Sequence, residues 1–175
     1  MLQHQIQKSL QSLIGLQLAA AGRAADLEWF HFGKLRTVSA YGGKTKLVGD
    51  YALHVQCAWR IRSATEIIVA SQDRYYPADG VQTDEEQFAW DVSGANRCDQ
   101  KIRQWLESYA DTMPTVRQIT ADEVGSLCLV FSSESRLEIF PDSTDTDEAA
   151  EHWRYFQPDT DLPHLVMRVS DLALE

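Results

Sequence analysis

The alternation of apolar and polar side chains from Tyr51 to Ile61 constrains the fold more than any other feature of the chain. In YALHVQCAWRI, every second residue belongs to a largely apolar set: Tyr51, Leu53, Val55, Cys57, Trp59 and Ile61. Successive side chains of a β-strand point to opposite faces, so His54, Gln56 and Arg60 share the other face. The segment is therefore predicted to be a strand with one face on a hydrophobic core.

Similar patterns predict more strands along the chain. Residues 16–33 are expected to form a hairpin that breaks at Gly22, whereas residues 39–50, SAYGGKTKLVGD, are expected to form a basic surface loop. The remaining expected strands are Glu66–Ser71, Thr115–Thr120, Gly125–Phe131, Arg136–Phe140, the segment HWRYFQP and the segment HLVMRVSDL.

Two helices are expected beside these strands. Apolar residues at spacings of three and four predict a helix over the first fourteen residues, ending at Gly15. Asn96 is a suitable N-cap for a second helix over Arg97–Tyr109. Together, the segments predict an α+β fold with a mainly antiparallel sheet and two principal helices, and 175 residues suit a single domain over 1–175.

Cysteine usage and hydropathy favour a cytoplasmic protein. Cys57, Cys98 and Cys128 match no zinc spacing and are expected to be reduced, buried thiols. A signal peptide is the alternative for the apolar run that starts near Ser12, but Gln17 interrupts that run. Because no apolar run reaches transmembrane length, no membrane association is predicted.

Charge is spread unevenly along the chain. The formal net charge is -10, made up of +4 over residues 1–70 and -14 over residues 71–175. This asymmetry suggests an acidic face, which repels nucleic acid and attracts basic protein partners. Solvated surface acids that only maintain solubility are the alternative explanation.

Familiar ligand-binding motifs are incomplete in this sequence. GGKT lacks the earlier glycine of a phosphate-binding loop, because Val38 stands at that position. The acidic loop that starts at Asp142 fails the EF-hand pattern, with Asp147 at the glycine position and Trp153 at the position of the last ligand. No catalytic residue, cofactor or metal site is therefore predicted.

Two histidines provide an alternative site. His54 and Cys57 point to opposite faces of one strand, so they are not expected to form a nucleophile–base pair. His31 and His54 both lie on strand-like segments and are candidates for a ligand pocket beneath the connection 73–96. Ordinary sheet histidines are the other interpretation of these two residues.

The order of segments resembles a group of small, uncharacterised bacterial proteins. Near the C-terminus, an E-x-WR-x-F segment formed by Glu151, Trp153, Arg154 and Phe156 resembles part of several immunity proteins that protect bacteria from toxins. The resemblance implies a non-enzymatic antitoxin that binds one toxin domain. Core packing of Trp153 and Phe156, with Arg154 paired to an acid, is the alternative role of these residues.

Two functional hypotheses follow from the sequence. The first is a cytosolic, non-enzymatic binding protein that binds a basic partner on an acidic surface, and its narrower form is an immunity protein that neutralises a toxin. The second is a small enzyme or ligand-binding domain with its pocket near His31 and His54. The expected partner-binding residues are Asp84, Glu85, Glu86, Asp142, Asp145, Asp147, Glu148 and Glu151.

Overall fold

Two antiparallel sheets form most of the protein. The structure, a computed structural model, describes residues 1–81, 88–109, 111–147, 149–169 and 171–175. The six-stranded sheet has the order β1 (Leu18–Ala24), β2 (Leu27–Phe32), β5 (Tyr51–Val55), β11 (Trp153–Phe156), β12 (Leu165–Met167) and β13 (Leu172–Leu174). The five-stranded sheet has the order β7 (Ile67–Ala70), β6 (Ala58–Arg62), β10 (Arg136–Phe140), β9 (Leu127–Phe131) and β8 (Val116–Ala121).

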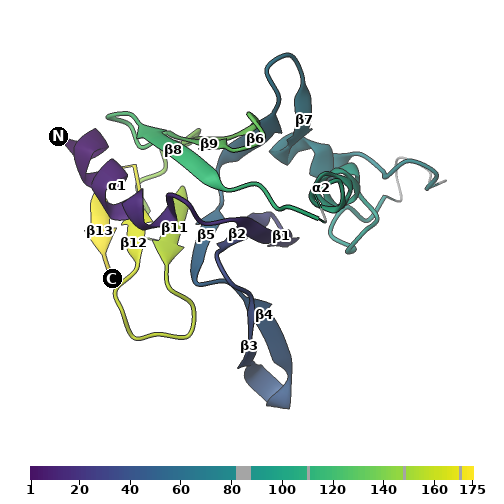
Figure 1. The fold of residues 1–175 in the computed structure, drawn as a ribbon, viewed down its shortest axis with the longest axis horizontal. Helices are drawn as coiled ribbons and strands as arrows, with labels where there is room; N and C mark the ends of the chain where they lie inside the picture. The colour runs from purple at the N-terminus through teal and green to yellow at the C-terminus, as the bar shows by residue number, and fades with distance from the viewer. Residues whose placement is uncertain (82–87, 110, 148, 170) are drawn as a thin grey trace.

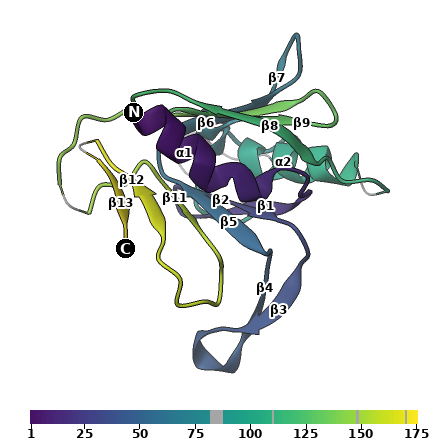
Figure 2. The same ribbon diagram turned by 60° about the vertical axis from the view of Figure 1, so that its left-hand side comes forward.

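A separate hairpin and two helices complete the fold. Strands β3 (Arg36–Ser39) and β4 (Thr45–Val48) pair with each other and project away from the two larger sheets (Figures 1 and 2). The helices are α1 (Leu2–Leu10) and α2 (Arg97–Glu107). This arrangement confirms the predicted α+β fold with antiparallel sheets and two principal helices.

The chain crosses from one sheet to the other inside the segment Tyr51–Ile61. The prediction of one continuous strand was wrong here, because β5 belongs to the six-stranded sheet and β6 to the five-stranded sheet. At the crossing, the backbone N–H groups of Gln56 and Cys57 both donate to the carbonyl of His152, at 2.9 and 3.3 Å. The alternation still predicted the buried face correctly, since Leu53, Val55, Cys57, Trp59 and Ile61 all lie in the core.

One hydrophobic core joins the two sheets. Phe30 of β2 packs edge-on against Trp59 of β6, with ring centroids 5.4 Å apart, and both residues are buried. Trp153 of β11 is fully buried, and its Nε1 donates a 2.8 Å hydrogen bond to the carbonyl of Gly125, just before β9. The two sheets therefore fold as one packed unit.

The helices pack against edge strands of these sheets. Helix α1 contacts the edge strand β8 and buries Ile6 and Leu10, while α2 contacts the edge strands β1 and β7. The predicted N-cap of α2 is confirmed, because the Asn96 side chain accepts a 2.8 Å hydrogen bond from the backbone N–H of Asp99.

Two segments that contain glycine differ from the sequence-based prediction. Gly22 does not break the first hairpin; it lies inside β1 opposite Trp29, whose ring would approach a Cβ at that position to 2.5 Å. The turn instead falls at Ala25 and Asp26. Residues 39–50, expected to be a loop, instead contain strand β4 and the turn of the β3–β4 hairpin, where Gly42 and Gly43 both adopt positive φ.

The three cysteines are free thiols, and two of them are buried. Cys57 and Cys98 are buried as predicted, and Cys128 is only half-buried. Burial, with a smaller effect of the Asp142 carboxylate, raises the pKa of the Cys57 thiol to about 12. Cys57 is thus a neutral core thiol in the metal-free protein.

The buried face of β5 generates a test of this core. We expect Leu53→Ala, at a fully buried position, to lower the free energy of unfolding by about 2–5 kcal/mol, because it leaves a cavity between the sheets. The control Leu162→Ala, at a side chain that is 53% exposed, should change it by less than about 0.5 kcal/mol. Urea unfolding followed by tryptophan fluorescence measures both values, and equal losses would contradict this placement of the core.

Candidate functional site

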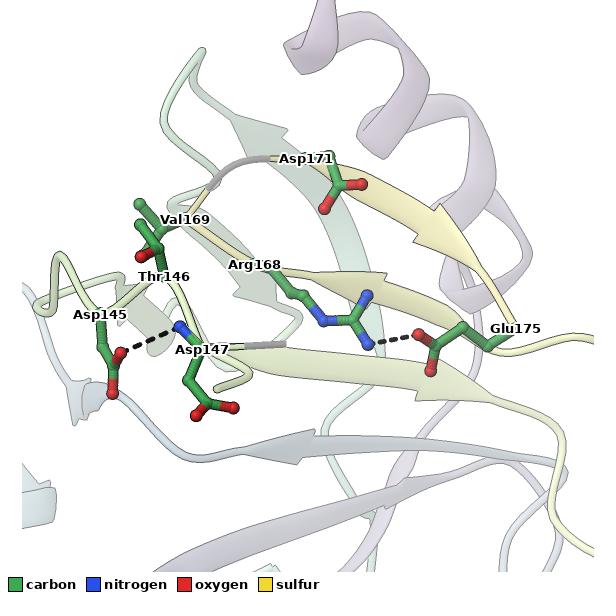
Figure 3. A pocket seen from close by; sticks show the side chains of 7 residues that line it. All are labelled: Asp145, Thr146, Asp147, Arg168, Val169, Asp171 and Glu175. Atoms are coloured by element: carbon green, nitrogen blue, oxygen red, sulfur yellow. Dashed lines mark hydrogen bonds and ion pairs between the residues drawn. The ribbon is translucent and has the colours of Figure 1, made fainter. Parts of the chain in front are cut away.

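An acidic pocket lies between the loop after β10 and the C-terminal hairpin β12–β13. It has a volume of about 440 Å³ and is lined by Asp145, Thr146, Asp147, Arg168, Val169, Asp171 and Glu175 (Figure 3). Four of these residues are acidic and one is basic, so the lining has a formal charge of -3. Acids that are up to 30 positions apart in the sequence thus converge on one concave surface.

Backbone hydrogen bonds hold the acidic loop in place. Oδ1 of Asp145 accepts a 3.0 Å bond from the N–H of Asp147, and Oδ1 of Asp147 accepts a 2.8 Å bond from the N–H of Ala149. These are side-chain turns of the kind that Asp and Asn favour. Each carboxylate therefore stabilises the loop through its Oδ1 atom.

Arg168 lies on the opposite wall within a network of charged groups. Figure 3 shows its guanidinium directed at Glu175, with which it forms an ion pair, and it also lies 4.0 Å from Glu151. Arg154 pairs with Glu151 and lies 3.1 Å from Glu175. The hydrogen bond from Arg168 lowers the pKa of Glu175, so this carboxylate stays ionised to lower pH than usual.

The E-x-WR-x-F segment supports this network from β11. Trp153 is in the core, Arg154 bridges Glu151 and Glu175, and Phe156 is half-buried, with its ring stacked on His164 at 4.4 Å. Core packing of Trp153 and acid pairing of Arg154 are both present. The segment therefore has a structural role whether or not it also contacts a partner.

The structure separates the predicted partner-binding residues into groups. Asp145 and Asp147 line the acidic pocket, and Glu151 lies behind it. Asp142 lies apart, beside Cys57 and His152. The positions of Asp84, Glu85, Glu86 and Glu148 fall outside the described residues. Sequence reasoning missed Asp171 and Glu175, because isolated acids near a terminus form no pattern.

A second cavity contains the two predicted histidines. It has a volume of about 290 Å³ and is lined by Trp29, His31, Lys46, Leu47, Val48, His54, Phe156 and Pro158. His31 on β2 and His54 on the neighbouring β5 both reach it, and the β3–β4 hairpin forms its other wall. Among the described residues, none from the connection 73–96, which was expected to cover this pocket, contributes to the lining.

Both histidines are neutral at pH 7. Nδ1 of His31 accepts a 3.0 Å hydrogen bond from the N–H of Gly49, which places the ring proton on Nε2. Burial, followed by the charge of Lys46, lowers the pKa of His31 to about 4. Burial, followed by the proximity of His31, lowers the pKa of His54 to about 4. These values are far from pH 7, so the rings suit hydrogen bonding better than proton transfer.

Comparisons with known proteins leave the family open. No protein-family model, curated protein or solved structure matches this chain. Among the described residues, no helix has the length and apolar character needed to cross a membrane. The resemblance to immunity proteins therefore stays a prediction.

The lowered pKa values of His31 and His54 generate a pH prediction. Between pH 6.5 and about 4, the unfolded chain binds protons at these positions and the folded protein does not. The free energy of unfolding should therefore fall as the pH decreases through this window. Above pH 6.5, both states hold neutral rings, so the two groups add no pH dependence there.

Proton NMR of the ring Cε1–H signals and urea unfolding measure these effects. The His31 and His54 signals should not move between pH 8 and 5.5, and His54→Gln should show a smaller stability loss than the original protein between pH 6.5 and 4. Titration of His54 with an ordinary histidine pKa of 6.5 would contradict its burial in this cavity.

Proposed function

We propose that this protein is a non-enzymatic binding protein that takes a basic segment of a partner protein into its acidic pocket. The observation behind the proposal is the convergence of Asp145, Asp147, Asp171 and Glu175 on one concave surface with a formal charge of -3. A pocket of this charge attracts Lys and Arg side chains and repels nucleic acid and anionic lipid.

The dimensions of the pocket suit a long cationic side chain. Its volume of about 440 Å³ exceeds that of one Arg or Lys side chain, and its polar lining offers carboxylate oxygens from two walls. Thr146 and Val169 add contact surface for the alkyl part of such a side chain. A guanidinium could pair with the loop carboxylates while Arg168 stays paired with Glu175.

Neutralising the loop carboxylates tests this proposal. The double variant Asp145→Asn and Asp147→Asn removes two charges but keeps the Oδ1 acceptors that hold the loop. We expect a peptide of six arginines to associate about threefold to tenfold more slowly with this variant at low salt, because steering by charge acts mainly on the association rate. Stopped-flow fluorescence with a labelled peptide measures the rate.

A second pair of acids gives a matched control. Asp159→Asn and Asp161→Asn remove the same charge from the exposed loop between β11 and β12, away from the pocket lining. This control should bind the peptide within about twofold of the original rate. Equal slowing in both double variants would mean that net charge alone attracts the peptide, and the pocket proposal would be lost.

The narrower proposal is that the partner is a bacterial toxin domain. The E-x-WR-x-F segment and its resemblance to immunity proteins support this form. Co-expression with a toxin domain encoded beside the gene should then restore growth, and the pocket double variant should restore it less well than the control pair. If no toxin gene lies near this gene, the immunity proposal is contradicted, whereas the more general binding proposal is not affected.

The histidine cavity supports a second candidate function, the binding of a small planar ligand. His31 and His54 converge there with the Trp29 and Phe156 rings, and Lys46 adds a positive charge at its wall. Such a lining combines aromatic surface with a few polar groups, as small-molecule sites do. A bound ligand would shift the ring signals of both histidines, whereas a ligand in the acidic pocket would leave them unchanged.

A further inference from the structure

Three metal-ligating side chains meet at the junction of the two sheets. The sulfur of Cys57, a ring nitrogen of His152 and a carboxylate oxygen of Asp142 all lie within 4.8 Å of one another. Cys57 belongs to the crossing between β5 and β6, Asp142 follows the end of β10, and His152 directly precedes β11. The cluster therefore joins the crossing at Cys57 to the two ends of the loop between β10 and β11, and sequence spacing alone does not show this contact.

Backbone hydrogen bonds fix two of the three residues. The carbonyl of His152 accepts from the N–H groups of Gln56 and Cys57, and the N–H of His152 donates to the carbonyl of Met167 at 2.9 Å. Cys57 and His152 are thereby held next to each other by the fold itself. Such preorganisation reduces the conformational cost of binding an ion.

Two donors of the cluster are buried and one is exposed. Cys57 is 5% exposed and His152 is 6% exposed, whereas Asp142 is exposed. An ion can therefore reach the buried sulfur and imidazole from the side of Asp142. Asp145 and Asp147 of the same loop lie outside this cluster and accept backbone hydrogen bonds.

We propose that Cys57, Asp142 and His152 form a zinc-binding site. Sulfur, imidazole nitrogen and carboxylate oxygen are the three donor types of protein zinc sites, whereas calcium and magnesium require mainly oxygen. Tetrahedral bonds of 2.0–2.3 Å separate ligand atoms by about 3.5 Å, so the cluster must contract by little more than about 1 Å. Asp142 is exposed and can supply this movement.

The proposed ion would connect the two ends of the acidic loop to the crossing between the sheets. Asp142 and His152 stand at the two ends of the segment that contains Asp145 and Asp147, and Cys57 stands at the crossing between the sheets. Three protein ligands also leave a fourth tetrahedral position for water or a group from a partner. The zinc site does not depend on the proposed partner binding, and its test uses the protein and the metal alone.

Titration of the protein with Zn²⁺ or Co²⁺ tests the site. We expect one Zn²⁺ per chain by calorimetry, and Co²⁺ should give visible bands of a tetrahedral ion with a near-ultraviolet thiolate charge-transfer band. Asp142→Ala and Cys57→Ala should each weaken Zn²⁺ binding at least about 100-fold, since each removes one of three ligands. Zn²⁺ should raise the melting temperature of the original protein and not that of Asp142→Ala.

Matched controls separate this site from other thiols and acids. Cys128→Ala removes a half-buried thiol and Asp161→Ala removes an exposed acid outside the cluster, and both variants should bind Zn²⁺ like the original protein. Absence of the charge-transfer band, or its persistence in Cys57→Ala, would overturn the proposal. If Cys57→Ala does not fold, unchanged Zn²⁺ affinity in Asp142→Ala, at an exposed position, would overturn the three-ligand site.

Discussion

The pair of hydrogen bonds from Gln56 and Cys57 to the carbonyl of His152 connects the two halves of this protein. At this point the chain leaves the six-stranded sheet and enters the five-stranded one. A crossing of this kind exposes backbone groups that a continuous strand would pair, and buried groups of this type must find other partners. The carbonyl of His152 satisfies both N–H groups, so the start of β11 is fixed to the crossing, and with it the end of the acidic loop.

Both candidate sites depend on this arrangement. The acidic pocket forms because β11 and β12 bring the C-terminal hairpin beside the loop after β10, where Arg154 and Arg168 bind Glu151 and Glu175. These arginines stabilise acids that would otherwise repel one another. The histidine cavity forms where His54 of β5, the register partner of Arg154 in β11, approaches Phe156 with ring centroids 4.8 Å apart. One set of strands therefore positions two chemically different surfaces.

The sequence predicted some residues of each site, and different physical reasons explain why the other residues were not predicted. Period-two alternation predicted that His31 and His54 share a sheet environment, and an acid-rich loop predicted Asp145 and Asp147 as surface residues. Asp171 and Glu175 were not predicted as pocket residues, because their contribution depends on pairing between β12 and β13. The cluster of Cys57, Asp142 and His152 was not predicted either, since sequence spacing does not show which residues meet at a junction between sheets.

The sequence by itself determined the two helices, most of the strands and the buried faces. Alternation specifies which side chains avoid water, and the Asn96 cap specifies where α2 can begin. Only the tertiary structure decided that the alternating segment Tyr51–Ile61 divides between two sheets. The physical reason is that apolar and polar side chains alternate with a period of two whether the segment forms one strand or two consecutive strands. The hydrogen-bond partners of the backbone, by contrast, are residues far away in the chain, such as His152.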